Sequence, residues 1–189
     1  MKKIILIGAG GHAKSCMDVI DSQKKFKVSL MVDKVYKNQG QIKTILELDF
    51  LANYELSKKN LFIGVGQLKS GKLRKKIFKF YKNKGCIFPT IKSKLSYVSK
   101  NSSIGEGTII MHKAFVNSNV SIGKNCIINS GVIIEHDVII GNNVHIAPGA
   151  IILGGCNIKE NSFIGSGTVL KQNTILTKET ILPSGKYIK

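Results

Sequence analysis

The second half of the chain carries an apolar repeat of six residues. Every sixth position from Val98 to Leu182 is aliphatic, and the position four residues after each of these is small or β-branched, from Ser102 to Thr180. A helix needs an apolar period near 3.6 residues, whereas two inward positions in every six are typical of a β-solenoid. Polar corner residues such as Asn117 and Gly123 separate the short apolar segments. Three hexads then close one triangular turn, and each aliphatic side chain stacks on its counterpart one turn earlier.

The first half begins with the stretch IILIGAGGHAKSCMDVI at residues 4–20. The leading aliphatic residues predict a buried strand, Gly8, Gly10 and Gly11 predict a tight turn, and a helical pattern follows at once. Further along, the motif LFIGVG precedes a helix-like segment at residues 72–85. These alternating patterns indicate an α/β arrangement with a parallel sheet.

The glycine turn satisfies the fingerprint G-x-G-x-x-G/A, and Asp33 follows a second strand-like run, 20 residues after Ala13. A dinucleotide needs two mononucleotide-binding halves and a domain for hydride transfer. Only about ninety residues precede the repeats, so we expect a single β-α-β-α-β unit and disfavour NAD. The turn can instead present backbone N–H groups to the diphosphate of one nucleotide. The alternative is that the glycines merely permit a tight turn between strand and helix.

Two domains follow from these patterns. We expect a Rossmann-like β-α-β-α-β domain over residues 1–90 and an all-β parallel solenoid over residues 91–189.

Candidate acid–base chemistry lies within residues 129–150. His136 occupies the third place of its hexad, beyond the inward Ile134, so its side chain should point outward at a corner. Glu135 and Asp137 flank it, and a carboxylate beside an imidazole fixes the tautomer and raises the basicity of the ring. We prefer Asp137 as the partner, although the sequence leaves both carboxylates open. The alternative is a histidine exposed on a solvated edge without a catalytic role.

The hexad pattern resembles the hexapeptide-repeat acyltransferases, whose fold is a left-handed parallel β-helix. With the motifs GAGGHAKS and LFIGVG before it, the chain is similar to the branch that contains UDP-4-amino-sugar N-acetyltransferases and sialic acid O-acetyltransferases. The resemblance implies acetyl-CoA as co-substrate, no metal, and a homotrimer with sites between subunits. It also implies that His136 is the general base that takes a proton from the substrate amine.

The resemblance assigns further residues to the site. It places Gly8, Gly10, Gly11 and His12 at the sugar nucleotide, Asp33 at the nucleoside, and Asn129 at the active site. The coenzyme side is expected to include His145, Gly154, Gly155 and Gly165. The expected oxyanion donor is a backbone N–H from a coil of the neighbouring subunit, with the loop around Gly154 and Gly155 as the candidate. For Asn129 the alternative is a corner residue chosen for its turn conformation, and for His145 it is a packed structural histidine.

Composition changes this picture only a little. The net charge is +18, but Arg74 is the only arginine among 29 basic residues, and there is no tryptophan. Proteins that read bases favour arginine and stacking aromatics, so we expect no nucleic-acid partner and prefer an anionic small ligand. The four cysteines are scattered, which favours buried thiols over zinc or disulfides. No apolar run approaches 18 residues, so we expect no membrane span and a cytoplasmic location.

The function predicted from the sequence is N-acetylation of a UDP- or GDP-linked 4-amino-4,6-dideoxy sugar in bacterial surface-glycan synthesis. Two alternatives stay open: O-acetylation of a sialic-acid-type sugar, and a non-catalytic β-helix scaffold.

Overall fold

Four parallel strands form the N-terminal sheet of the computed structural model, which describes residues 1–36, 42–67 and 70–189. Their order across the sheet is β3-β2-β1-β4. The strands are β1 (Lys2–Ile7), β2 (Phe26–Asp33), β3 (Thr44–Leu46) and β4 (Leu61–Ile63), and the helices are α1 (Gly11–Ser22), α2 (Glu47–Asn53) and α3 (Lys72–Asn83).

The central strand β1 is apolar on both faces because helices cover both. Ile4 and Leu6 pack on one side in a cluster with Cys16 of α1. Ile5 and Ile7 pack on the other side in a cluster that includes Phe50 of α2 and Tyr81 of α3. A continuous aliphatic run instead of strict alternation is what a parallel sheet buried on two faces requires.

Residues 91–188, all of which the structure describes, form a β-solenoid of seventeen two-residue strands. Their bounds are β5 (Ile91–Lys92), β6 (Tyr97–Val98), β7 (Ser103–Ile104), β8 (Ile109–Ile110), β9 (Phe115–Val116), β10 (Ser121–Ile122), β11 (Ile127–Ile128), β12 (Ile133–Ile134), β13 (Ile139–Ile140), β14 (His145–Ile146), β15 (Ile151–Ile152), β16 (Asn157–Ile158), β17 (Phe163–Ile164), β18 (Val169–Leu170), β19 (Ile175–Leu176), β20 (Ile181–Leu182) and β21 (Tyr187–Ile188).

The solenoid strands form three parallel sheets, which we call the first, second and third faces. The first face contains β5, β8, β11, β14, β17 and β20, the second contains β6, β9, β12, β15, β18 and β21, and the third contains β7, β10, β13, β16 and β19. Each strand pairs with the strand 18 residues earlier, as in Ile128 with Ile110 and Ile134 with Val116. From β6 onward the second residue of each strand points inward, and these side chains belong to one continuous core.

These observations confirm the predicted fold class, an α/β parallel-sheet domain followed by a left-handed parallel β-helix. The structure adds a short edge strand, β3, to the predicted unit, and the solenoid starts at β5, one strand before the hexad of Val98. The expected division between residues 90 and 91 falls immediately before β5.

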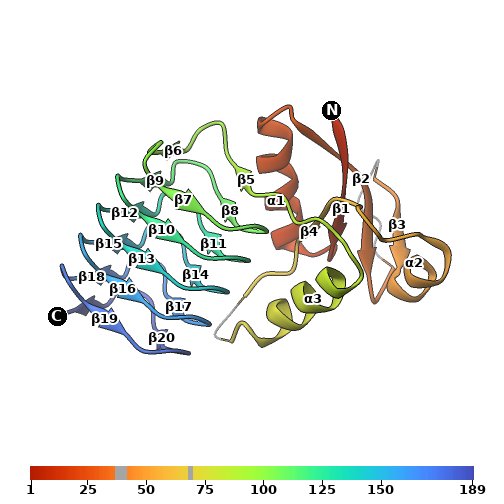
Figure 1. Ribbon diagram of the computed structural model, residues 1–189. Coiled ribbons are helices and arrows are strands. Elements are labelled where there is room, and N and C mark those ends of the chain that lie inside the picture. The colour runs from red at the N-terminus through yellow and green to blue at the C-terminus, as the bar shows by residue number, and fades with distance from the viewer. Residues whose placement is uncertain (37–41, 68–69) are drawn as a thin grey trace.

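The two parts of the chain pack through α1, α3 and the first face of the solenoid (Figure 1). Outward-pointing Ile109 and Ile127 of the first face belong to the same buried cluster as Ile4 and Leu6 of the sheet. A polar contact adds to this interface, because His112 Nε2 lies 2.8 Å from Asp18 Oδ2 of α1. The sheet and the solenoid therefore share one continuous apolar core at this interface.

All four cysteines are free and buried. Cys16 and Cys86 lie in the N-terminal part, whereas Cys126 and Cys156 point into the solenoid. Burial raises the pKa of the Cys126 thiol to about 11 and that of Cys16 to about 12.

The inward isoleucines should carry the stability of the solenoid. Ile146 is fully buried, so Ile146→Ala should lower the free energy of unfolding by about 2–5 kcal/mol through lost burial and a residual cavity. Ile175 points outward from β19 and is 69% exposed. Ile175→Ala should therefore change the free energy of unfolding by less than about 0.5 kcal/mol. Equilibrium urea unfolding measures both, and equal losses would contradict the inward assignment.

Candidate active site

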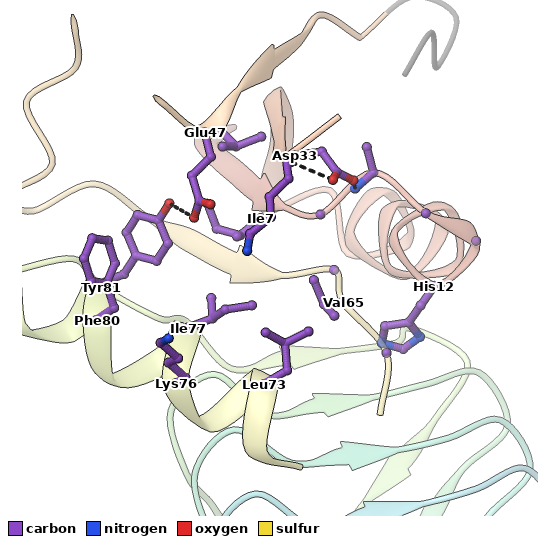
Figure 2. Close-up of a pocket in the computed structure, with 18 of the residues that line it drawn as sticks. Ile7, His12, Asp33, Glu47, Val65, Leu73, Lys76, Ile77, Phe80 and Tyr81 are labelled. Carbon is purple, nitrogen blue, oxygen red and sulfur yellow. Dashed lines mark hydrogen bonds between the residues drawn. The ribbon is translucent and has the colours of Figure 1, made fainter. Parts of the chain in front are cut away.

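A cavity of about 670 Å³ opens between the carboxyl ends of β1 and β4. The strand order changes direction at this point, since β2 and β3 extend to one side of β1 and β4 lies on the other. Ligands of open parallel sheets bind at such switch points. The turn after β1, the end of β2, the loop after β4 and α3 line the cavity (Figure 2).

The turn after β1 leaves the N-terminus of α1 without a side-chain cap. Gly8 has φ of +105°, and a Cβ atom there would lie 2.8 Å from Cγ2 of Val65, so this position requires glycine. A Cβ atom on Gly10 or Gly11 would meet nothing within 4 Å. Packing therefore does not demand glycine at these two positions. Gly10 is the N-cap of α1, and no described side chain caps the first N–H groups of the helix.

Asp33 anchors this turn at the end of β2. Its Oδ2 accepts a hydrogen bond from the Ala9 amide at 2.8 Å, and its Oδ1 accepts one from the Lys34 amide at 2.7 Å. The predicted nucleoside-binding aspartate thus lies in the cavity wall and also holds the glycine turn in place.

Helix α3 forms the opposite wall of the cavity, and this wall was not predicted from the sequence. Leu73, Ile77 and Phe80 of α3 line the cavity with Lys76, and Figure 2 shows Leu73 and Ile77 pointing toward it. Their spacing of three and four residues is an apolar helix stripe, which was the available signal.

A polar pair lies at the end of that wall. The Tyr81 hydroxyl donates to Glu47 Oε1 at 3.3 Å. Burial, with the Glu47 carboxylate beside it, raises the pKa of Tyr81.

His12 lies at the solenoid end of the cavity. Burial, with Arg74 and His145 nearby, lowers the pKa of His12 to about 3, so its ring is neutral at pH 7. Within the described part of the chain its Nε2 is buried without a hydrogen-bond partner. The ring packs against Gly66 in the loop after β4.

His145 joins this loop to the solenoid. Its Nδ1 lies 2.6 Å from the Gln67 carbonyl oxygen, and its Nε2 lies 3.1 Å from Nδ2 of Asn129. A carbonyl only accepts, so Nδ1 carries the proton and Nε2 accepts from the amide. Burial lowers the pKa of His145 to about 4. These contacts favour the packed structural role for His145, and a role at the coenzyme stays a prediction.

His136 lies at a different corner, between the second and third faces. Its Nδ1 is 2.8 Å from Asp137 Oδ2, whereas Glu135 accepts a hydrogen bond from Asn117 Nδ2 at 2.7 Å. The structure thus pairs His136 with Asp137, the preferred of the two carboxylates. The hydrogen bond from His136 lowers the pKa of Asp137. With Nδ1 engaged, Nε2 of the half-exposed ring can accept a proton.

The next coil of the solenoid supports the His136 ring. A Cβ atom on Gly154 would lie 2.7 Å from Cε1 and 2.8 Å from Nε2 of His136, so only glycine allows the ring to lie on this backbone. The amide of Gly155 donates to the His136 carbonyl at 3.0 Å, which leaves the Gly154 amide as the candidate oxyanion donor. Gly165 lies at another corner, where a Cβ atom would meet the backbone of Ser184.

The predicted site residues thus form separate groups within one chain. The glycine turn, His12 and Asp33 line the cavity, and His145 and Asn129 adjoin its solenoid end. Glu135, His136, Asp137, Gly154 and Gly155 gather at the corner between the second and third faces, opposite the first face on which the N-terminal part is docked. A single chain therefore does not bring the cavity and the candidate base together.

Comparisons with known proteins agree with both parts of the fold. Residues 3–80 match the PglD N-terminal domain, and residues 101–136 and 137–172 match the bacterial transferase hexapeptide. The acetyltransferase domain of PglB from Neisseria gonorrhoeae is 25% identical, with a TM-score of 0.88, covering 100% of this chain and 92% of that one. In both its N-terminal part and its solenoid, the chain is similar to bacterial hexapeptide-repeat sugar acetyltransferases. This confirms the family that the sequence resembles.

Two further structures share the fold of this hexapeptide-repeat transferase. WeeI from Acinetobacter baumannii is 20% identical with a TM-score of 0.78, covering 100% of this chain and 97% of that one. PerB from Caulobacter crescentus, solved with CoA and GDP-perosamine, is 21% identical with a TM-score of 0.69. The match covers 96% of this chain and 92% of that one. Comparison with curated proteins gives no match.

The described part of the transferase contains neither a candidate metal site nor a helix fit to cross a membrane. Among its described residues, no group of three or more His, Cys, Asp or Glu side chains is arranged to hold a metal ion. None of the described helices combines the length and the apolar character that crossing a membrane requires.

The buried histidine His145 should make stability depend on pH. Its pKa is about 4 in the folded state, against 6.5 for an exposed histidine, so only the unfolded chain gains this proton between those values. Stability should therefore fall as pH decreases from 6.5 toward 4, by up to about 1.4 kcal/mol per pH unit for this group. His12 acts in the same direction. Urea unfolding at several pH values should show a shallower dependence in His145→Gln, and an identical slope would contradict the assignment.

Proposed function

We propose that the protein is an acetyl-CoA-dependent N-acetyltransferase that acts on the amino group of a UDP- or GDP-linked 4-amino-4,6-dideoxy sugar. The observation that carries the proposal is the His136–Asp137 pair, an imidazole oriented by a carboxylate at an exposed corner. The acetyltransferases among the solved relatives, with acetyl-CoA or CoA and GDP-perosamine in their structures, support this reaction class.

The cavity provides the features that a nucleotide sugar needs. The N-terminus of α1 favours a diphosphate, because the helix dipole and the N–H groups that no described side chain caps attract anions. Lys34 and Lys76 line the same cavity and add positive charge. The apolar stripe of α3 offers a surface for the nucleoside, and Asp33 stays the predicted contact to it.

The chemistry begins with a proton transfer at His136. As the substrate amine attacks the thioester carbonyl of acetyl-CoA, Nε2 of His136 takes a proton from the nitrogen. Asp137 holds the ring in the reactive tautomer and stabilises its charged form. The Gly154 amide is our candidate donor to the oxyanion of the tetrahedral intermediate, whose collapse releases the CoA thiolate. We assign His145 and Gly165 to the region that receives the coenzyme, and Asn129 to the substrate.

A homotrimer would bring the separated groups together. The second face is flanked by the corner of Asn129 and Gly165 on one side and the corner of His136 on the other. Around a three-fold axis, contacts are head-to-tail, so one corner of each copy meets the other corner of the next. The cavity of one copy and the base of its neighbour would then form one site, in the cytoplasm where we expect the protein.

The outward side chains of the second face support such packing. All are apolar, half-buried to exposed, and none carries a charge; they are Tyr97, Phe115, Ile133, Ile151, Val169 and Tyr187. The third face instead presents Ser103, Ser121 and Asn157 among its outward residues. The outward isoleucines of the first face are covered by the N-terminal part, so the apolar stripe of the second face indicates a face that is covered in the assembly.

His136→Ala should abolish turnover without affecting the fold. We expect kcat to fall by about 10²–10⁴-fold, the usual contribution of a general base. Release of CoA thiol from acetyl-CoA measures this, with UDP- and GDP-linked 4-amino-4,6-dideoxy sugars and free sialic acid offered in parallel. Lys100→Ala is the control, because Lys100 is the corresponding corner residue two coils away. Turnover of sialic acid alone would favour O-acetylation, and no turnover of any substrate would favour a scaffold.

Ile133→Glu should convert the trimer to monomers, because the carboxylate would be buried in the apolar face at a cost of several kcal/mol. The matched control is Ile139→Glu, since Ile139 is also outward, 50% exposed, but on the third face. Light scattering after size exclusion gives the mass of each variant. We expect the Ile133 variant alone to lose both the trimer and activity, and a trimeric Ile133 variant would argue against this interface.

A further inference from the structure

The only arginine of the chain is buried between the cavity and the solenoid. Arg74, the third residue of α3, is 1% exposed. Its Nη1 donates to the carbonyl oxygens of Ile63 at 2.9 Å and Val65 at 2.6 Å, and its Nη2 donates to Asn125 Oδ1 at 2.9 Å. Within residues 1–36, 42–67 and 70–189, no carboxylate forms an ion pair with it, and Nε is buried without a partner. Burial lowers the pKa of Arg74 to about 10, so it is still charged at pH 7.

At the cavity end, the guanidinium fixes the turn that forms one wall. The two carbonyls flank Gly64, whose amide donates to the Ile7 carbonyl at 2.8 Å. A Cβ atom on Gly64 would lie 2.8 Å from Cβ of Ala13, so this turn is in close contact with α1. Val65 in turn touches Gly8 of the phosphate-binding turn. Moving the Ile63–Val65 backbone would therefore change the cavity where the nucleotide is proposed to bind.

At the other end, Arg74 contacts a ladder of asparagines along the solenoid. Asn125 Nδ2 donates to Asn143 Oδ1 at 2.9 Å, and Asn143 Nδ2 donates to Asn161 Oδ1 at 3.3 Å. The ladder runs along the corner between the third and first faces, so the guanidinium links the rigid solenoid to the cavity wall. Each asparagine accepts a hydrogen bond from the group before it, and Asn125 and Asn143 each donate one to the asparagine that follows in the ladder.

The choice of arginine is informative because the chain otherwise uses lysine at every basic position. A buried cation without a carboxylate is costly, and lysine has no planar fork to reach three acceptors in different directions. The need for that geometry explains why position 74 carries an arginine whereas the other 28 positions of this kind carry a lysine.

We propose that Arg74 is a positioning residue for nucleotide-sugar binding, which holds the Gly64–Val65 wall of the cavity in register with the solenoid. The inference rests on the proposed function. It predicts that Arg74 sets affinity for the nucleotide and leaves affinity for acetyl-CoA unchanged, because Arg74 bonds to the cavity wall and to Asn125, and none of these residues is assigned to the coenzyme.

The test compares Arg74→Lys with the wild-type protein by calorimetric titration with UDP and GDP and by steady-state kinetics. We expect Kd for the bound nucleotide and KM for the nucleotide sugar to rise about tenfold or more, with KM for acetyl-CoA unchanged. Lys79→Ala, an exposed change on the same helix, should leave all three constants as in wild type. A merely structural arginine would lower the active fraction, and hence kcat, without this split.

Each outcome bears on the proposal. If a folded Arg74→Lys protein binds the nucleotide with wild-type affinity, the proposal for Arg74 is overturned and the proposed function stands. Wild-type protein that binds neither nucleotide overturns the proposed function and this inference together. If Arg74→Lys does not fold, Asn125→Ala removes the solenoid end of the fork, together with the bond to Asn143, and leaves the bonds from Arg74 to Ile63 and Val65. It should weaken nucleotide binding about threefold, and an unchanged Kd would overturn the proposal.

Discussion

Backbone pairing between successive coils is the constraint on which the rest of the molecule depends. Because each strand bonds to the strand 18 residues away, every corner residue has a fixed neighbour above and below it. The partner of His136 in the next coil must be Gly154, and the partner of Asn125 must be Asn143. The side chain at one corner can therefore be large only where the next coil leaves room. The six-residue period thus determines the environment of the candidate base as well as the fold.

The docking of the two domains is the second organising feature. Isoleucines of the first face complete the apolar core of the sheet, and the loop after β4 reaches the solenoid through Gln67, His145 and Asn129. This arrangement fixes the cavity relative to the coils without placing it beside His136. The chain thus presents two half-sites on opposite sides of a rigid prism. Symmetric assembly is the simplest way for such halves to meet.

The sequence predicted those features that depend on local periodicity. The unbroken hexads specified the solenoid, and the glycine turn followed by a helical pattern specified the first strand and helix. The pairing of His136 could not be decided locally, because Glu135 is occupied by Asn117 from the preceding coil. The separation of His136 from the cavity could not be predicted either, because it depends on the face to which the N-terminal domain docks. The apolar stripe of α3 is visible in the sequence, but the surface that it faces depends on tertiary packing, and so does the role of Gln67.

The buried cysteines give the protein a property unrelated to catalysis. Reaction of a thiol requires both access and the thiolate form, and burial denies both to Cys16 and Cys126 in the folded state. Alkylating reagents can therefore reach these sulfurs only during an opening event. Since Cys16 and Cys86 lie in one domain and Cys126 and Cys156 in the other, the rate of labelling at each position reports which part of the molecule opens first. The chain thus contains its own chemical probes of whether sheet and solenoid unfold as one unit or as two.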